Sequence, residues 1–313
     1  PPSEPEPPVT PPSQPQTPVT PPSQQAPGTP ADNFVVDPSG RNTPPPIGLA
    51  AVPAQPRAPD AVMAVLTADH YMRDEARFRE VLAAAVEVAS GGGIVTLGIQ
   101  PDTPATGFGY IERGALAQTI QGVQVYELVQ FREKPDAGTA EGYVASGRYS
   151  WNSGMFIWQV SRLMREFEQH APEIYRSLTE IASAVGEARY NDVLRSVWPT
   201  MRKISIDYAL MEHVREGVYV IPVEMGWSDV GSFDALYDIL ADGSSNVEQA
   251  DAALLVDTRG SLVMSDKLVA TIGLEDVIIV ETEDALLVCH RSRAQDVKQI
   301  VEKLKAENRD RYL

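Results

Sequence analysis

The sequence predicts an α/β fold that is followed by a small all-β unit and a terminal helix. From Asp60 onward, apolar runs of strand length alternate with amphipathic helical segments, which is typical of α/β proteins. After Asn246, short apolar runs are separated by turn residues at short, regular intervals, which indicates a compact β unit. We therefore expect a proline-rich arm at residues 1–32, an α/β domain at 33–245, and a β unit with its helix at 246–313.

The composition limits the classes of function. The 313 residues carry a net charge of −17, and no cluster of Lys and Arg with interleaved aromatic residues offsets it, so we expect no nucleic-acid partner. The longest apolar runs fall far short of the ~20 residues that a membrane-spanning helix needs, so we expect no membrane segment. The single cysteine, Cys289, has no disulfide partner within these residues and suits a reducing cytoplasm, where we expect the protein to be located.

The first thirty residues form a decamer that repeats with decay, "PPSEPEPPVT", "PPSQPQTPVT" and "PPSQQAPGTP". Proline fixes φ and removes backbone donors, and large apolar residues are nearly absent, so this segment predicts a disordered or polyproline II-like arm. It is either a spacer or a ligand for an SH3 or WW domain. The lack of an initiating Met and of an apolar signal-peptide core suggests a fragment or a fused linker.

The α/β part begins with "AVMAVL", which reads as a buried strand, followed by the helix "DEARFREVLAAAVEVA" and the strand "GIVTLGI". The helix places a set of apolar residues on one face: Phe78, Val81, Leu82, Ala85 and Val88. This alternation predicts a largely parallel sheet. Further along we expect the strand "VQVYELVQF", the helix "AGTAEGYVAS", the strand "GMFIWQV", helices across 160–214, the strand Val218–Val223 and a final helix, "AQDVKQIVEKLKAENRDRYL".

Two acids follow predicted strands. Asp69 comes after "AVMAVLTA" and Asp229 after "VYVIPVEMGWS". Ligands of open α/β sheets bind outside the carboxyl ends of the strands, and two carboxylates without a neighbouring base suit Mg²⁺, which takes oxygen ligands. The alternative is that each acid is only the N-cap of a following helix.

The segment "FREKP", residues 131–135, lies between a predicted strand and a predicted helix. Lys134 is a candidate phosphate contact and Glu133 a candidate acceptor for sugar hydroxyls. Alternatively, Pro135 opens the helix at its first position and the two charged side chains are solvated.

Two further segments are candidates for ligand contacts. In "WNSGMF", residues 151–156, Asn152 either points its amide at a polar ligand or belongs to a simple turn. In "TGFGYIE", Gly107 and Gly109 suggest a backbone that approaches another group closely.

Other chemistries lack their usual carriers. The sequence contains no GxxxxGK[ST] phosphate loop, no HExxH, no paired Cys and no GxSxG. The histidines are scattered along the chain at His70, His170, His213 and His290. Serine or cysteine hydrolysis and zinc chemistry are therefore not expected.

Seven segments in order resemble the bacterial mannose-1-phosphate guanylyltransferase family: "GRNTPPPIGLAA", "AVLTADH", "TGFGYIE", "FREKP", "WNSGMF", "KISIDYALME" and "GWSDVGSF". The resemblance covers about residues 33–313. It implies a Rossmann-like nucleotide-diphospho-sugar transferase fold with a mixed sheet and a β-helix-like C-terminal unit. It also implies Mg²⁺-dependent synthesis of GDP-mannose from GTP and mannose 1-phosphate, and a homodimer formed through the C-terminal unit.

The resemblance also assigns roles to matching positions. Asp69 and Asp229 would bind the metal, and together with Lys134, which would meet the sugar phosphate, they would form the catalytic set. Mannose would be contacted by Glu133, Asn152 and the backbone of Gly109, while the nucleotide would lie near Arg41, Asn42 and Thr43.

The family begins with a strand and a glycine-rich loop that cradles the triphosphate, and the proline-rich arm stands in that place here. We therefore expect a sheet that is incomplete at its N-terminus and a weakened GTP site. Two alternatives follow: a catalytically silent module for sugar-phosphate binding or oligomerisation, and a sugar-1-phosphate nucleotidyltransferase of other specificity.

Overall fold

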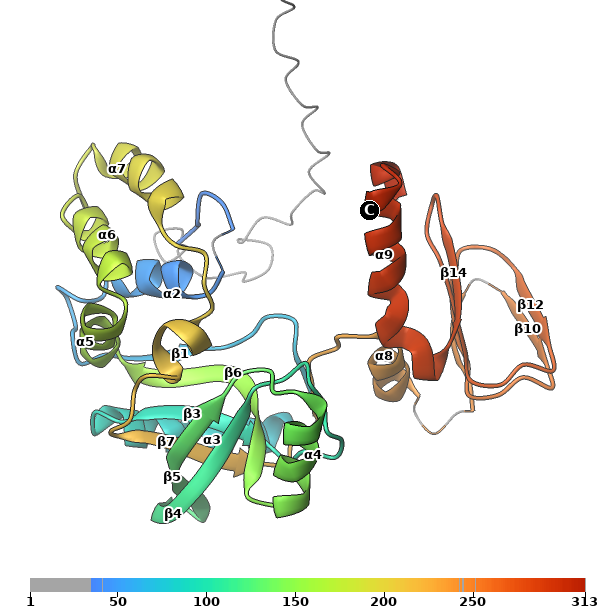
Figure 1. Cartoon of the computed structure of the whole chain (residues 1–313), viewed down its shortest axis with the longest axis horizontal. Helices are drawn as coiled ribbons and strands as arrows, with labels where there is room; N and C mark the ends of the chain where they lie inside the picture. The colour runs from blue at the N-terminus through green and yellow to red at the C-terminus, as the bar shows by residue number, and fades with distance from the viewer. Residues whose placement is uncertain (1–34, 41, 242, 244, 251, 313) are drawn as a thin grey trace, which may run out of the picture.

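The computed structural model describes residues 35–40, 42–241, 243, 245–250 and 252–312. The α/β part contains a central sheet with helices packed on it. A smaller β unit with helix α9 lies beside this part (Figure 1). The proline-rich arm lies outside the described residues, so its expected conformation stays a prediction.

The central sheet has six strands, whose spatial order is β1 (Val62–Val65), β6 (Tyr149–Gln159), β3 (Ile94–Ile99), β7 (Val218–Val223), β5 (Val123–Arg132) and β4 (Tyr110–Ile120), with β4 also pairing with β6. Only the β3–β7 pair is parallel among the described strands of this sheet, and its other pairings are antiparallel. The prediction of a largely parallel sheet is therefore wrong, while the mixed sheet is confirmed.

The strand direction differs from the prediction because β4 and β5 form a direct hairpin. Its two turn residues, Gln121 and Gly122, have φ values of 47° and 86°. Positive φ at both central positions is the signature of the type I′ turn that joins antiparallel strands. Alternating strands and helices elsewhere in the sequence do not reveal such a hairpin.

The prediction that the first strand is buried is also wrong. In β1, Val62, Met63 and Val65 are half-buried and Ala64 is exposed, because the strand lies at the end of the sheet and pairs only with β6 among the described strands. By contrast, β3 lies inside the sheet and all of its residues are buried, as predicted.

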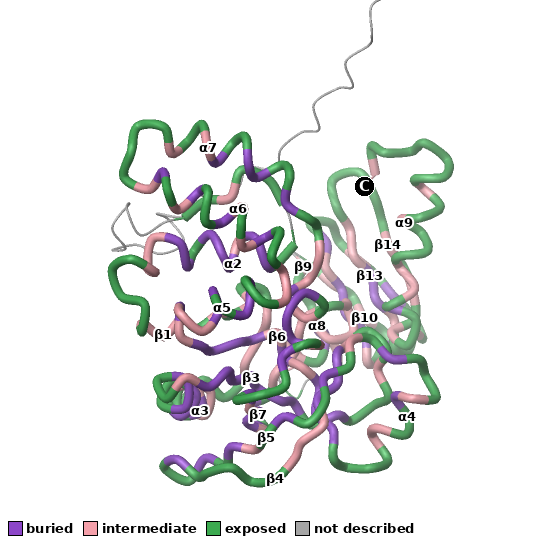
Figure 2. The backbone as a smooth tube through the Cα atoms, turned by 60° about the vertical axis from the view of Figure 1, so that its left-hand side comes forward, coloured by how far each residue is buried: buried purple, intermediate pink, exposed green. Residues whose placement is uncertain are grey.

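Helices cover both faces of the sheet (Figure 2). One face carries α2 (Pro44–Ala51), α5 (Val160–His170), α6 (Pro172–Ala182) and α7 (Tyr190–Val197), and the other α3 (Glu75–Ser90) and α4 (Ala137–Ser146). The alternation of side chains along a strand serves both cores, since Phe156 and Trp158 of β6 pack on the first face and Met155 and Ile157 on the second.

Four short elements lie outside the main sheet. A two-stranded sheet joins β2 (Tyr71–Met72) to β8 (Trp227–Ser228). Between α7 and β7 lie a 3₁₀ turn, η2 (Trp198–Thr200), and a π-helical turn, η3 (Asp207–Met211). Such π-helical turns occur frequently at functional sites.

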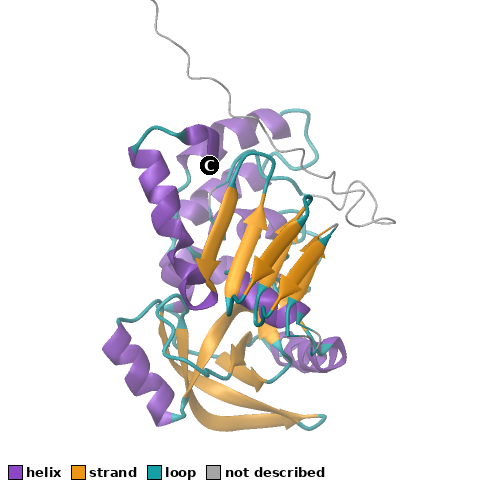
Figure 3. Cartoon of the chain, turned by 90° about the vertical axis from the view of Figure 1, so that its right-hand side faces the viewer, coloured by secondary structure: helices purple, strands orange, loops and turns teal. Residues whose placement is uncertain are grey.

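The C-terminal unit is built from stacked parallel strands (Figure 3). Its strands are β9 (Val247–Ala250), β10 (Ala253–Val256), β11 (Leu262–Ser265), β12 (Val269–Ile272), β13 (Val277–Glu281) and β14 (Leu286–His290). β9, β11 and β13 pair in parallel, as do β10 and β12, which is the β-helix-like arrangement expected.

Helices flank this unit at both of its ends. α8 (Phe233–Leu240) precedes it, and the predicted terminal helix is divided into η4 (Arg291–Asp296), α9 (Val297–Ala306) and η5 (Asp310–Tyr312). Across the described part of the chain, no helix combines the length and the apolar character that crossing a membrane requires.

Candidate active site

The two candidate metal-binding acids come from neighbouring loops. Asp69 precedes β2, and Asp229 directly follows β8. The pairing of β2 with β8, with Tyr71 opposite Ser228, therefore holds the two loops side by side. Both carboxylates also act electrostatically on the ring of His70.

The helix-cap alternative is wrong for both acids. The N-cap of α3 is Asp74, which accepts from the backbone N–H of Arg77 at 2.9 Å, and the N-cap of α8 is Ser232. The side chain of Asp69 is 86% exposed, and one oxygen of Asp229 accepts from the backbone of Gly231. The other oxygen of Asp229 and the whole carboxylate of Asp69 remain available to a ligand.

His70 links these two loops. Its Nδ1 accepts a hydrogen bond from the indole N–H of Trp227 at 3.1 Å, and its Nε2 lies 4.0 Å from Asp69. Burial lowers the pKa of His70 below its ordinary value, and the carboxylates of Asp69 and Asp229 oppose this shift only partly. The ring is therefore neutral at pH 7, with a lone pair on Nδ1 that faces Trp227.

The donor set at this edge fits Mg²⁺. The described residues contain no group of three or more His, Cys, Asp or Glu side chains that would enclose a metal. Mg²⁺ does not need such a cage, because it usually binds one or two carboxylates and completes its shell with water and substrate phosphates. Asp69 and Asp229, with free oxygens on adjacent loops, match that pattern.

A second polar cluster surrounds the end of β5. Lys134 donates to Glu133 Oε1 at 2.5 Å, and the side chain of Glu133 is only 7% exposed. The alternative with both side chains solvated is therefore wrong for Glu133. Pro135 does not open the helix either, since α4 begins at Ala137 and is capped by Asp136.

Asn152 is oriented into this cluster from within β6, so the simple-turn alternative is wrong. Its Oδ1 accepts from Thr96 at 3.1 Å, which leaves its Nδ2 to donate to Asp207 Oδ1 at 3.0 Å. These two bonds fix which end of the amide faces which partner.

Asp207 is a site residue that the sequence did not assign. It lies at the start of η3, and burial together with the nearby carboxylate of Glu133 raises its pKa to about 6. Its segment, "KISIDYALME", was among the matching motifs, and that was the only signal pointing to it.

The candidate nucleotide residues are only partly described. Thr43 lies beside Asp207, because its hydroxyl accepts from the backbone N–H of Ile206 at 2.8 Å. Asn42 is exposed and accepts from the backbone of Thr43, while Arg41 lies outside the described residues.

The close-approach prediction holds for one of the two glycines. A Cβ on Gly109 would lie 2.5 Å from Glu133 Oε2, whereas a Cβ on Gly107 would meet nothing within 4 Å. Gly109 therefore makes room for the carboxylate of Glu133, and Gly107 does not have this role.

A row of aromatic rings joins the acid pair to the polar cluster. Ring centroids are 5.2 Å apart for His70 and Trp227, 5.6 Å for Trp227 and Phe108, and 4.9 Å for Phe108 and Trp151. Phe108 precedes Gly109 and Trp151 precedes Asn152 in the chain. These ring contacts connect the loops of the two acids with the polar cluster.

Comparison with known families identifies the α/β part. Residues 23–246 match the family described as nucleotidyl transferase. The chain belongs to the nucleotidyl transferase family. Residues 251–304 of this nucleotidyl transferase also match the β-helix domain described for mannose-phosphate isomerase and GMP-like proteins.

Individual relatives of this nucleotidyl transferase carry related names. A mannose-1-phosphate guanylyltransferase of Escherichia coli K12 is 40% identical over 90% of this chain and 59% of its own length. The xanthan biosynthesis protein XanB of Xanthomonas campestris is 38% identical over 90% and 59%, respectively. The chain thus spans about three fifths of the length of these curated relatives.

A solved structure extends the comparison to the fold. The crystal structure of a Thermus thermophilus protein, described as a mannose-1-phosphate geranyltransferase, has a TM-score of 0.75 and 32% identity to this nucleotidyl transferase. The match covers 87% of this chain and 77% of that one. It includes more than the α/β part, so the combination of a mixed sheet and a β unit is shared.

Proposed function

We propose that this chain forms GDP-mannose and pyrophosphate from GTP and mannose 1-phosphate. The names of its relatives support this reaction. The observation that carries the proposal is the row of aromatic contacts from His70 to Trp151, which connects the loops of the two carboxylates with the polar cluster.

In this proposal Asp69 and Asp229 bind Mg²⁺. When bound, the ion supplies positive charge that offsets the charge of the reacting phosphates. Lys134 adds a further charge beside the phosphate of mannose 1-phosphate, and its φ of 44° turns its backbone away from the strand. Its ion pair with Glu133 raises the pKa of Lys134, so the ammonium stays charged throughout the physiological range.

The sugar hydroxyls would be bound by the buried polar cluster. Glu133 and Asp207 are acceptors, and Asn152 supplies both an acceptor and donors. Gly109 is buried beside Glu133, and its carbonyl accepts from the backbone N–H of Asn152 at 2.8 Å. On the nucleotide side, we propose that Thr43, Asn42 and Arg41 lie near the GTP.

The reaction then needs positioning and charge neutralisation more than a protein nucleophile. An oxygen of the sugar phosphate attacks the α-phosphorus of GTP, a new O–P bond forms, and the bond to the β-phosphate oxygen breaks in line. Pyrophosphate leaves with the bonding electron pair. This explains why no serine, cysteine or histidine triad is required.

The direct test is pyrophosphate release by the purified chain with GTP, Mg²⁺ and mannose 1-phosphate, combined with calorimetric titration of GTP and of GDP-mannose. Release that requires all three reactants supports the proposal. Binding of mannose ligands without release would instead support the silent module. Parallel assays with ATP, UTP and dTTP, and with glucose 1-phosphate, test the alternative specificities.

We also propose that the chain divides at residue 245 into the α/β domain and the β unit. The β unit forms a homodimer, for which the exposed apolar residues Leu254, Val256 and Ile272 on the paired strands β10 and β12 supply a surface. A cytoplasmic location is supported by the unpaired Cys289.

A further inference from the structure

Helix α8 belongs to the core of the C-terminal unit, although it directly follows the candidate metal-binding loop. Tyr237 is buried in that core, and Phe233 and Leu236 pack against it. Within the described residues, neither core of the α/β part includes a residue of α8. Figure 1 shows α8 next to α9. From the α/β part, Arg73 also donates to the backbone carbonyl of Asp238, at 3.4 Å.

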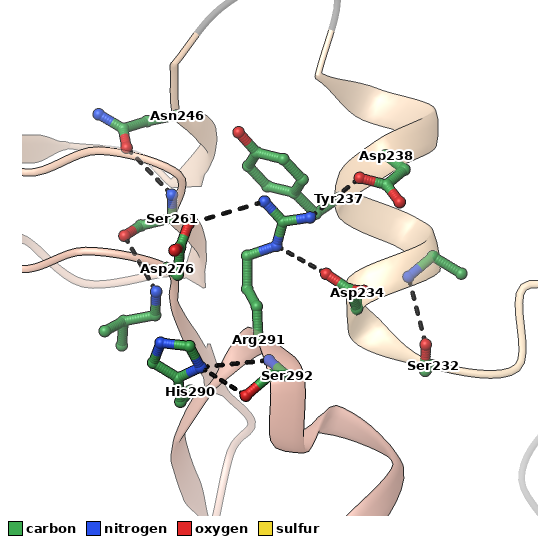
Figure 4. A network of polar contacts seen from close by, with 12 residues as sticks. Ser232, Asp234, Tyr237, Asp238, Asn246, Ser261, Asp276, His290, Arg291 and Ser292 are labelled. Atoms are coloured by element: carbon green, nitrogen blue, oxygen red, sulfur yellow. Dashed lines mark hydrogen bonds and ion pairs between the residues drawn. The ribbon is translucent and has the colours of Figure 1, made fainter. Parts of the chain in front are cut away.

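Arg291 fastens α8 to the C-terminal unit (Figure 4). Its Nε donates to Asp234 at 2.6 Å and its Nη2 to Asp238 at 3.0 Å, so the two ends of its guanidinium contact successive turns of α8. The guanidinium also lies 3.7 Å from the centroid of the Tyr237 ring, and Asp276 of the β unit lies 4.0 Å from its Nη1.

This set of contacts is stronger than an ordinary surface ion pair. The side chain of Arg291 is only 20% exposed, so its ion pairs are screened less by solvent than exposed pairs are. Planar guanidinium groups make several directed hydrogen bonds at once and also stack on aromatic rings. Arg291 therefore fixes the orientation of α8 as well as its distance from the β unit.

Only a short loop separates this fixed helix from β8. Asp229, Val230 and Gly231 lie between Ser228, which is paired with Tyr71, and Ser232, the N-cap of α8. Val230 has a φ of 49°, a left-handed conformation that is strained for a β-branched residue. Such strain persists only where the surrounding structure holds both ends of the segment.

The loop packs only loosely against the C-terminal unit. A hollow of about 510 Å³ lies there, lined by Val230, Gly231 and Ser232 on one side and by Gln295 and Lys298 on the other. Within the loop, Val230 donates to Ser228 and Gly231 donates to Asp229, which fixes its local shape. Its placement also depends on its two ends, and α8 is the end that packs in the core of the β unit.

We propose that the C-terminal β unit positions the metal-binding carboxylate of Asp229, with Arg291 as the positioning residue that acts through α8. This inference rests on the proposed role of Asp229. It assigns the β unit a part in the reaction, beyond any part in self-association.

The test compares Arg291→Gln with Arg259→Gln in the full chain. Arg259 is a matched control, because it also makes an ion pair within the β unit, with Glu275 at 2.6 Å, and this pair involves no residue of α8. A third variant, Arg291→Lys, keeps the positive charge but loses the several N–H donors of the planar guanidinium group. Hydrogen exchange of residues 229–236 and the Mg²⁺ dependence of pyrophosphate release are measured for each.

In Arg291→Gln we expect faster exchange across residues 229–236, with exchange in β11 unchanged. The Mg²⁺ concentration for half-maximal activity should rise about 10-fold, which is the lower end of the effects seen when a residue that orients a metal ligand is mutated. KM for mannose 1-phosphate should be unchanged. Arg291→Lys should show a smaller rise, and Arg259→Gln none.

Exchange at residues 229–236 that matches the Arg259→Gln control would overturn the proposal, as would faster exchange confined to the β strands. If Arg291→Gln speeds up hydrogen exchange throughout the β unit, the same two criteria are applied to Arg291→Lys instead. The exchange measurement does not depend on turnover. A parent chain that releases no pyrophosphate therefore contradicts the proposed function, whereas unchanged exchange contradicts the role of Arg291.

Discussion

Trp227 donates its indole N–H to Nδ1 of His70, and this single bond joins the loop that carries Asp69 to the loop that carries Asp229. It reinforces the short backbone pairing of β2 with β8. Backbone bonds from Arg73 to Gly226 and from Asp74 to Met225 extend this pairing, and the side-chain bond adds to them. The relative position of the two acids therefore depends on residues outside the proposed metal site.

We expect Trp227→Phe to raise the Mg²⁺ concentration for half-maximal pyrophosphate release by about 10-fold, because outer partners of metal sites have effects of this size. Trp198→Phe is the matched control, since it removes an indole N–H that donates to the carbonyl of Ser39 at 2.7 Å in another part of the fold. Equal Mg²⁺ dependence in the two variants would contradict the role of the His70 bond.

Gly109→Ala should impair sugar binding without unfolding the protein. The new Cβ would displace the carboxylate of Glu133, which lies 2.5 Å from that position. We expect KM for mannose 1-phosphate to rise at least ~10-fold, the effect of losing one charge-assisted hydrogen bond worth about 1.5 kcal/mol. Gly107→Ala has open space around its Cβ and should leave KM unchanged. The same KM in both variants would remove Glu133 from the sugar site.

Asp207→Asn should change how stability depends on pH. In the folded protein the pKa of Asp207 is raised to about 6, above its ordinary value of 3.8, chiefly by burial and by Glu133. The folded state therefore binds this proton more tightly, and the stability that it contributes is lost as pH rises from 4 through about 6.

Asparagine keeps the acceptor for Asn152 and cannot ionise. Relative to the parent, the free energy of unfolding of Asp207→Asn should increase by up to about 3 kcal/mol between pH 4 and 7 and then level off. Urea unfolding followed by tryptophan fluorescence at several pH values measures this difference. A difference that stays constant across the range would show that Asp207 titrates normally.

Asp229→Asn should reduce pyrophosphate release by more than ~100-fold while leaving thermal stability nearly unchanged, since a directly binding carboxylate matters at least as much as an outer partner. Asp192→Asn, at an exposed position on α7, is the control for a lost negative charge. Activity of Asp229→Asn near the control level would place the metal elsewhere.

Ile272→Glu should weaken self-association through the β unit. Ile272 is 76% exposed and lies opposite Val256 on the same face of β10 and β12, so a charge there would be costly to bury in a dimer. Val129→Glu is the control, because Val129 is likewise an exposed apolar residue, at 55%, but lies on β5 outside the β unit. Light scattering after size-exclusion chromatography should give a dimer for the parent and the control and a monomer for Ile272→Glu. A monomeric parent would contradict the proposed dimer.

The sequence predicted the elements better than their connections. The amphipathic pattern of residues 74–89 and the apolar run of residues 93–99 correspond to α3 and β3 within one residue at each end, because burial periodicity is a local property. Strand direction in the sheet is not local, and the positive φ values of Gln121 and Gly122 that create the β4–β5 hairpin have no strong signature in a Gln-Gly pair.

The same limit applies to the candidate site. Asp69 and Asp229 were found because each follows a strand, and the structure shows that other residues cap the helices. Asp207 was missed because its importance comes from burial and from bonds to residues far away in sequence, such as Asn152. Pattern analysis finds residues at the ends of elements more readily than partners that tertiary packing brings together.

The membership of α8 in the C-terminal core has a consequence for how the protein matures during synthesis. Domains fold broadly in the order in which they leave the ribosome. Asp69, Glu133 and Asp229 therefore emerge before Leu262 and Ile278, which complete the core around α8, and before Arg291. The three acids are thus present early in synthesis. The helix that follows the loop of Asp229 is held in place only after the later β strands and Arg291 have been translated. If Asp229 has its proposed role, the site is therefore complete only after Arg291 has been translated.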